Sequence, residues 1–240
     1  MTRVSTREFY EAGYALADPA EAARMGRWRA LGARTKAAHI ETLCARAGLR
    51  PRTVVELGCG DGSVLAELAA RGHVVDGFEL SENAARQARE RNVARKVEAF
   101  DGEHVPAETH EYELAVLSHV LEHVPDPLPL LEEAARVAPY VLVEVPLEDN
   151  RSARRPAKRK LSEQSGHLHA FNRASVNALV TRARLEPRAD LTDALPYEHH
   201  AFFGGAAKGA VKWAVRSAVH GLGAAEHLFT VHYAVIATRA

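Results

Sequence analysis

Short apolar runs rich in β-branched residues alternate with longer amphipathic segments through the middle of the chain. The apolar runs cover residues 53–59, 73–80, 96–100, 113–120 and 140–147. The segments with helical spacing cover residues 63–72, 82–92 and 129–138. Repeated strand-then-helix units favour crossover connections, so the pattern predicts an α/β fold with a parallel, doubly wound sheet.

The two ends of the chain follow other patterns. Residues 5–48 are rich in Ala, Arg and Glu, and Leu31, Ala38, Leu43 and Ala47 have helical spacing, which predicts an N-terminal helical cap over 1–50. The last third predicts a helix over 172–186 and strands over 185–191 and 229–239, with a helical insertion at about 204–222 between the strands. We interpret residues 1–240 as one domain, with a core over 51–185 and C-terminal strands over 186–240.

Composition narrows the class of protein. The chain has 240 residues, is 47% hydrophobic, and carries 31 basic and 31 acidic residues, so no overall charge attracts nucleic acid. Its two cysteines, Cys44 and Cys59, are too few for a disulfide scaffold and suit a reducing compartment. The N-terminus has no signal-peptide pattern and no apolar run is long enough to span a membrane, so we expect a cytoplasmic protein.

The first apolar run ends in a glycine-rich loop. Glu56-Leu57-Gly58-Cys59-Gly60-Asp61-Gly62 places three glycines at alternate positions, directly before a helix that begins near Ser63. Glycine allows close approach of a ligand to the backbone, and the helix start offers free N–H groups, so the loop predicts a nucleotide-like ligand.

An acidic residue at the end of the second run, Glu79, follows Gly58 by about twenty residues. At this spacing a carboxylate reaches the ribose hydroxyls of a nucleotide held at a glycine loop. Asp76 competes for that role but lies inside the strand. The segment Phe100-Asp101-Gly102-Glu103, after the third run, offers a carboxylate that can form a hydrogen bond with the edge of an adenine ring.

With these elements in order, and with Ser118-His119-Val120-Leu121-Glu122-His123-Val124 as a fourth motif, the chain resembles the class I S-adenosylmethionine-dependent methyltransferases. The resemblance covers roughly residues 50–185 and, more loosely, the last strand. It implies a Rossmann-like seven-stranded sheet whose last strand is antiparallel. It also implies S-adenosylmethionine as cofactor and S-adenosylhomocysteine as product.

The resemblance further assigns roles to single residues. Glu56, Gly58 and Gly60 would shape the pocket for the methionine part, and Ser118 would lie beside it. Glu79 would hold the ribose, Asp101 would contact the adenine amino group, and Leu80 and Gly102 would flank the ring.

A sulfonium is already an activated methyl donor, so the protein mainly aligns the acceptor and removes its proton where needed. The candidate bases are His119, His123, His167 and His169, each of which has a packing role as its alternative. Imidazoles at these positions suit a transition metal. However, we expect no metal site, since neither a metal nor a covalent residue is required.

The expected function is methyl transfer to an oxygen or nitrogen of a small molecule, such as a sugar, a nucleotide-linked intermediate or a secondary metabolite. A dense basic run over 151–160 is either a solvated mobile loop or a lid for an anionic acceptor. Three roles are open for the basic helix over 204–222: it covers the acceptor site, it lies peripherally on a membrane surface, or it makes the contact of a homodimer. No nucleic-acid partner is expected. A non-catalytic S-adenosylmethionine-binding protein and, less favoured, an NAD-dependent oxidoreductase remain as alternatives.

Overall fold

The computed structural model describes residues 6–239, so the parts of the predicted cap and C-terminal segment that fall on residues 1–5 and 240 lie outside it. Seven strands are present in this range: β1 (Thr53–Leu57), β2 (Val74–Glu79), β3 (Val97–Ala99), β4 (Leu114–Ser118), β5 (Tyr140–Pro146), β6 (Leu185–Asp193) and β7 (His232–Arg239). The helices that bear on the site are α1 (Thr6–Tyr14), α2 (Pro19–Arg46), α3 (Ser63–Ala70), α4 (Glu82–Glu90) and the short 3₁₀ helix η1 (Leu121–His123).

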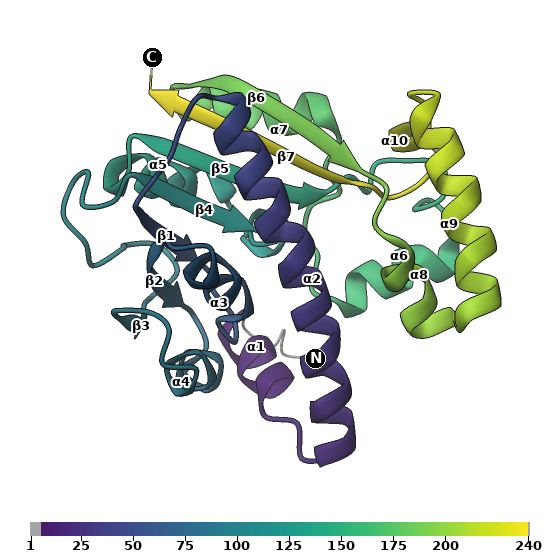
Figure 1. Cartoon of the computed structure of the whole chain (residues 1–240), viewed down its shortest axis with the longest axis horizontal. Helices are drawn as coiled ribbons and strands as arrows, with labels where there is room; N and C mark the ends of the chain where they lie inside the picture. The colour runs from purple at the N-terminus through teal and green to yellow at the C-terminus, as the bar shows by residue number, and fades with distance from the viewer. Residues whose placement is uncertain (1–5, 240) are drawn as a thin grey trace.

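The strands form one sheet in the order β3-β2-β1-β4-β5-β7-β6 (Figure 1). β7 pairs antiparallel with both β5 and β6, whereas the pairs among the first five strands are parallel. The expected doubly wound sheet with an antiparallel last strand is therefore confirmed. The strand order reverses between β1 and β4, and ligands of open α/β sheets bind at the carboxyl ends of strands at such a point.

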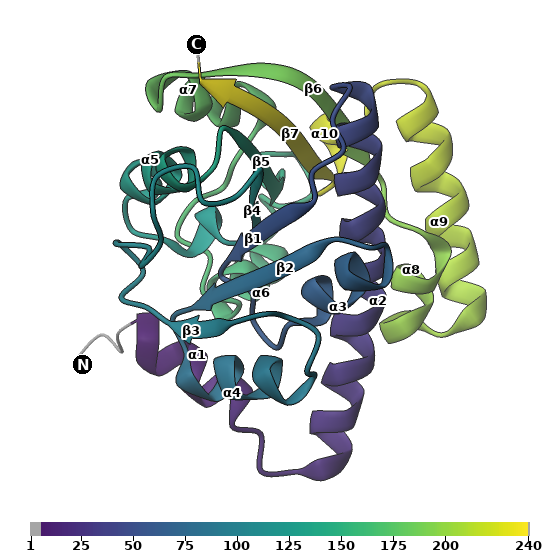
Figure 2. The ribbon, with the colours of Figure 1, turned by 60° about the vertical axis from the view of Figure 1, so that its left-hand side comes forward.

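Helices cover the two faces of the sheet (Figure 2). A cluster of buried hydrophobic side chains lies on each face. α2, α3 and α4 pack on one face, where Ile40 and Leu65 are fully buried against Val54. α5 (Pro127–Val137) and α7 (Arg173–Arg182) cover the other face around Leu117 and Leu131. Because both faces are covered, the central strands are apolar along most of their length instead of alternating, which is why their sequence signal is strong.

The predicted N-terminal helical cap consists of two helices, α1 and α2. Asp18 caps α2 by accepting from the N–H of Ala20, and Pro19 occupies the first turn. Of the four positions that we expected to define the apolar stripe, only Leu43 is fully buried, while Ala38 is exposed. The residues that face the core are instead Ala33, Ala37, His39, Ile40, Leu43 and Cys44.

The helical insertion before the last strand is present as α8 (Tyr197–Gly204), α9 (Ala206–Gly221) and α10 (Ala225–Leu228), and α8 packs on α2. The basic run contributes to a further helix, α6 (Pro156–Gln164), which begins at Pro156 where we expected a loop or lid. Arg155 and Lys158 share a surface depression of about 620 Å³ with Lys208 and Lys212 of α9. Basic residues that are far apart in sequence are thus gathered on one surface.

Candidate active site

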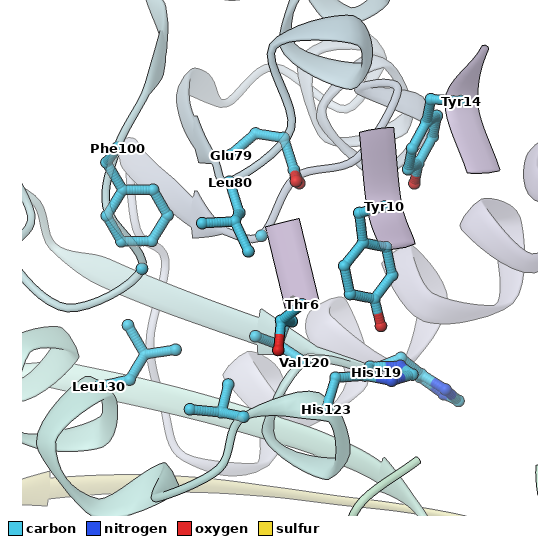
Figure 3. A pocket seen from close by; sticks show the side chains of 13 residues that line it. Thr6, Tyr10, Tyr14, Glu79, Leu80, Phe100, His119, Val120, His123 and Leu130 are labelled. Carbon is cyan, nitrogen blue, oxygen red and sulfur yellow. The ribbon is translucent and has the colours of Figure 1, made fainter. Parts of the chain in front are cut away.

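Two adjoining cavities lie at the carboxyl ends of β1, β2 and β4. The first has a volume of about 120 Å³ and is mostly apolar (Figure 3). Its lining residues are Thr6, Tyr10, Tyr14, Gly58, Glu79, Leu80, Phe100, Gly102, His119, Val120, His123, Val124 and Leu130. The second has a volume of about 260 Å³ and contains Glu56, Gly60 and Ser118 together with the cations Arg29 and Lys36. Tyr14, Gly58 and His119 line both cavities, so the two form one continuous candidate site.

The glycine loop requires glycine where it borders these cavities. Gly58 has φ +78°, and a Cβ built on it would lie 2.6 Å from Val120 Cγ2. Gly60 has φ +54°, and its Cβ would lie 2.6 Å from the hydroxyl of Tyr14. Both positions thus combine a left-handed backbone with close approach of a neighbouring side chain, which any other residue would disturb.

Glu79 ends β2 and faces the first cavity with its carboxylate (Figure 3). Its Oε2 accepts from the N–H of Gly60 at 2.7 Å and its Oε1 accepts from the N–H of Ser81 at 3.0 Å. Burial raises the pKa of Glu79, although these backbone hydrogen bonds oppose the shift. The two hydrogen bonds fix the carboxylate at the rim, and each oxygen keeps a lone pair for a ligand hydroxyl.

Glu56 lines the second cavity. It is buried, and its Oε2 has no hydrogen-bond partner among the described residues. Burial raises the pKa of Glu56 to about 8, a shift that the charge of Lys36 opposes. A buried acceptor of this kind favours a ligand that brings a cationic donor.

Of the remaining predicted cofactor residues, three line the cavities and one is exposed. Leu80 and Gly102 line the first cavity and Ser118 lines the second. Asp101 is exposed, and its Oδ1 accepts from the N–H groups of Glu103 and His104, both at 2.7 Å. These bonds lower the pKa of Asp101 to about 2. A contact of Asp101 with adenine stays a prediction.

Asp76, the competing acid, has a structural position. It is fully buried, and Arg95 binds both of its carboxylate oxygens, at 3.1 and 2.6 Å. The hydroxyl of Tyr112 also donates to it, at 2.9 Å. Asp76 therefore joins β2 to the segments beside it and does not face either cavity.

His119 follows β4 directly and has φ +60°, a left-handed conformation that is uncommon outside glycine. The side chain lies among buried acidic groups: its Nε2 is 3.7 Å from Glu144 Oε1 and its Nδ1 is 3.4 Å from Glu122 Oε1. Unusual backbone conformations of this kind concentrate at functional sites. His119 is the only one of the four predicted histidines that borders both cavities.

The other three histidines lie on or beside η1. His123 lines the first cavity, and its ring is 4.8 Å from that of His167, centre to centre. His167 binds Glu148 Oε2 through Nδ1 at 2.8 Å. His169 instead directs its Nε2 to the backbone carbonyl of Val124 at 2.8 Å and stacks beside Phe171. The structure brings His119, His123 and His167 together and leaves His169 outside the group.

The sequence leaves open whether Tyr10 and Tyr14 pack within a helix or fold over the cofactor, and in the structure both line the first cavity. They come from α1, which is held across the cavities because Glu11 accepts from the N–H groups of Glu82 and Asn83 at the start of α4. Sequence reasoning missed other residues of the site. Arg29 and Lys36 lie on α2 seven residues apart, a spacing that places both on one helical face and was the available signal. Glu122, Glu144 and His232 had no such signal, because their relation is visible only in three dimensions.

The sheet order and the cavity at the glycine loop define a doubly wound, nucleotide-binding α/β protein of the class I methyltransferase type. The model of the methyltransferase domain family matches residues 25–189. This match covers more than half of the chain, and the chain belongs to this family.

Individual relatives are more distant. The chain is 31% identical over 96 residues to a ubiquinone biosynthesis O-methyltransferase of Nitrosomonas europaea, an alignment that covers 38% of this chain and 40% of that protein. It thus spans less than half the length of this curated relative.

Two solved structures share the fold over nearly the whole chain. An S-adenosylmethionine-dependent methyltransferase of Thermotoga maritima, a possible histamine N-methyltransferase, has a TM-score of 0.66 at 17% identity, with 98% of this chain and 100% of that chain covered. Phosphoethanolamine N-methyltransferase 2 of Haemonchus contortus, in complex with S-adenosylhomocysteine, has a TM-score of 0.66 at 13% identity, with 99% and 60% covered. In residues 6–239, no helix is both long and apolar enough to cross a membrane.

Proposed function

We propose that this protein transfers the methyl group of S-adenosylmethionine to an oxygen or nitrogen atom of a small molecule. The observation that carries the proposal is the pair of adjoining cavities at the glycine loop. One is apolar with a carboxylate at its rim, and the other is polar with both acidic and basic groups. An adenosine and an amino acid require these two environments side by side.

The first cavity takes the adenosine in this proposal. Glu79 accepts from the ribose hydroxyls, and Leu80, Phe100 and Leu130 surround the ring. The second cavity takes the methionine part: Glu56 and the backbone of the 58–60 loop face the ammonium, and Arg29 or Lys36 pairs with the carboxylate. The sulfonium then lies between the cavities, where Gly58 and His119 line both.

The histidines next to the sulfonium position serve as the proposed proton acceptors. His119 and His123 line the first cavity, and His167 stands behind His123. The acceptor oxygen or nitrogen gives its proton to one of them and its lone pair forms the new bond to the methyl carbon. The carbon–sulfur bond breaks with its electrons going to sulfur, which leaves S-adenosylhomocysteine. His169 acts as a positioning residue, because its ring holds the backbone of Val124.

The acceptor is proposed as a small molecule, with a sugar, a nucleotide-linked intermediate or a secondary metabolite as the classes considered. An O-methyltransferase among the sequence relatives and an N-methyltransferase among the structural ones support this coarse class. The basic depression formed by α6 and α9 supports an acceptor with an anionic group. The two free cysteines, both buried, support a cytoplasmic location.

Isothermal titration with S-adenosylhomocysteine tests the proposal, with NAD⁺ as the competing ligand. We expect saturable binding of S-adenosylhomocysteine only, and a loss of about 10- to 100-fold in affinity for Glu79→Gln, since a buried charge-assisted hydrogen bond contributes about 1.5–3 kcal/mol. Glu98→Gln is the matched control, because Glu98 is an exposed acid on the neighbouring strand β3. Binding of NAD⁺ instead, or equal affinities in the two variants, would contradict the assignment.

A further inference from the structure

A buried carboxylate without hydrogen-bond partners lies beside the first cavity. Glu122, in η1, is fully buried, and neither Oε1 nor Oε2 has a hydrogen-bond partner within residues 6–239. The nearest charged groups are His119 Nδ1 at 3.4 Å and His123 Nε2 at 3.9 Å, which make ion-pair contacts without hydrogen-bond geometry. An ionised carboxylate in such surroundings is costly unless a cation binds it.

The two histidines nearest to this carboxylate are oriented by groups on their far side. His123 directs Nδ1 to the carbonyl of Gly166 at 3.2 Å, and His167 directs Nδ1 to Glu148 Oε2 at 2.8 Å. A carbonyl and a carboxylate only accept, so we assign the ring proton of each to Nδ1. Each Nε2 then keeps its lone pair. Metal-binding histidines show this arrangement, in which the second nitrogen donates to a carboxylate or a backbone carbonyl.

The potential ligand atoms are close enough to share one ion. One atom each from Glu122, His123 and His167 lies within 4.8 Å of the others. Ligands about 2.0–2.1 Å from a tetrahedral ion are themselves about 3.4 Å apart, so a small contraction closes the shell. Three protein ligands leave the fourth position of a tetrahedral shell open.

We propose that Glu122, His123 and His167 bind a divalent transition-metal ion of the Zn²⁺ type. Imidazole nitrogen together with one carboxylate suits Zn²⁺, Fe²⁺ or Ni²⁺, whereas Mg²⁺ and Ca²⁺ prefer oxygen ligands alone. From the sequence alone, the histidines suit a transition metal, but we expected no metal site. The unpartnered carboxylate and the two oriented histidines are the observations that favour it.

A second group, also of one carboxylate and two histidines, has no carboxylate without hydrogen-bond partners. His119, Glu144 and His232 also lie within 4.8 Å of one another. However, Glu144 is already bound by His39 Nδ1 and His232 Nδ1, both at 3.2 Å. Ser118 also donates to its other oxygen at 3.4 Å, so both oxygens of Glu144 accept hydrogen bonds. We therefore assign the metal to the group of Glu122, His123 and His167.

The proposed ion specifies which acceptor the proposed methyl transfer uses, and this part of the inference rests on the proposed function. His123 also lines the first cavity, and Figure 3 shows the phenol of Tyr10 directed toward His119 and His123 at this end. When bound, the ion would offer an open position to a hydroxyl oxygen of the acceptor and would lower the pKa of that hydroxyl. The hydroxyl proton passes to His119, the oxygen forms the bond to the methyl carbon, and sulfur takes the electrons of the broken bond. The acceptor class is therefore a hydroxyl compound and not an amine.

Titration of Zn²⁺ into the chelator-treated full-length chain tests this inference, with Mg²⁺ as the competing ion. We expect one equivalent of Zn²⁺ to bind and Mg²⁺ not to compete. Glu122→Gln and His167→Ala should each weaken Zn²⁺ binding by about 100-fold, and Glu148→Gln by about 10-fold because it acts only through His167. Cobalt replacement adds a second readout, since the visible absorption of bound Co²⁺ should disappear in His167→Ala.

His227→Gln is the matched control, because His227 is an exposed histidine of α10 that lines neither cavity of the site. It should bind Zn²⁺ like the unmodified chain. Absence of saturable Zn²⁺ binding, or equal affinity in His167→Ala and the unmodified chain, would overturn the proposal. Titration of S-adenosylhomocysteine into the same samples separates the two proposals: cofactor binding without Zn²⁺ binding refutes only the metal, whereas absence of cofactor binding refutes the proposed function.

Discussion

Two fully buried glutamates, Glu144 and Glu122, lie on either side of His119 and differ in how their charges are compensated. Glu144 accepts hydrogen bonds from His39 and His232, whereas neither oxygen of Glu122 has a hydrogen-bond partner among the described residues. Both side chains are therefore equally buried, but in the described part of the chain only the carboxylate of Glu144 accepts hydrogen bonds from other side chains. The comparison indicates that Glu144 holds the fold together and that Glu122 is arranged for something the protein binds.

The elements that meet at Glu144 explain its structural role. His39 comes from α2, His232 begins β7, and Asp193, at the end of β6, binds the other ring nitrogen of His39 at 3.1 Å. Burial alone would raise the pKa of Glu144, but its contacts with His119, His232 and His39 hold that pKa well below the usual range. The group thereby fixes the N-terminal helix to the antiparallel end of the sheet.

Replacement of Glu144 should produce the largest effect. Glu144→Gln leaves the charge of His39 without its buried partner, and loss of one partner of a buried pair destabilises by about 3–5 kcal/mol. Urea denaturation of the variant and the unmodified chain measures the change in unfolding free energy. An unchanged midpoint would show that the Glu144 group does not stabilise the fold.

Replacement of His39 should produce a smaller effect that depends on pH. Burial alone would lower the pKa of His39, but hydrogen bonds to Asp193 and Glu144 raise it to about 9. Because the folded pKa lies above the unfolded value, the stabilisation is fully present below about pH 6.5 and is lost as the pH rises through 9. The shift corresponds to an upper bound of about 3 kcal/mol. His39→Gln should therefore be destabilised at pH 6 and should approach the unmodified chain at pH 10.

Urea denaturation at these two pH values distinguishes the charged histidine from a packing role. A loss of stability that is equal at pH 6 and pH 10 would mean that His39 acts through its shape and not through its charge.

Replacement of Glu122 should produce the smallest effect. In metal-free buffer, Glu122→Gln removes the ion-pair contacts with His119 at 3.4 Å and His123 at 3.9 Å. These are longer than the contacts of Glu144 with His39 and His232, so the unfolding free energy should fall by only about 1 kcal/mol. The same denaturation experiment measures it beside Glu144→Gln. A loss comparable to that of Glu144→Gln would abolish the distinction between the two glutamates.

The sequence predicted the features that depend on neighbouring residues. Continuous apolar runs located the strands, and the glycines of the 58–62 loop with Glu79 located the cavities, because each signal lies within one strand and its following loop. The break between α1 and α2 was missed although Asp18-Pro19 marks it, since the surrounding Ala-rich pattern continued on both sides.

The grouping around His119 could not be predicted in the same way. His39 and His232 lie 105 and 88 residues from Glu144 along the chain, and each of the three belongs to a different element. Their proximity follows from the position of β7 between β5 and β6, which brings the last strand back beside the fifth. Only the assembled sheet shows which histidines share a carboxylate and which carboxylate is left without a partner.

A crystal structure of the chain with S-adenosylhomocysteine would show whether the two cavities bind the cofactor. We expect adenosine in the first cavity with its ribose at Glu79, the amino-acid part beside Glu56, and the sulfur atom facing the side of His119 on which Glu122 lies. Cofactor bound elsewhere, or a sulfur atom directed away from His119 and His123, would contradict this assignment.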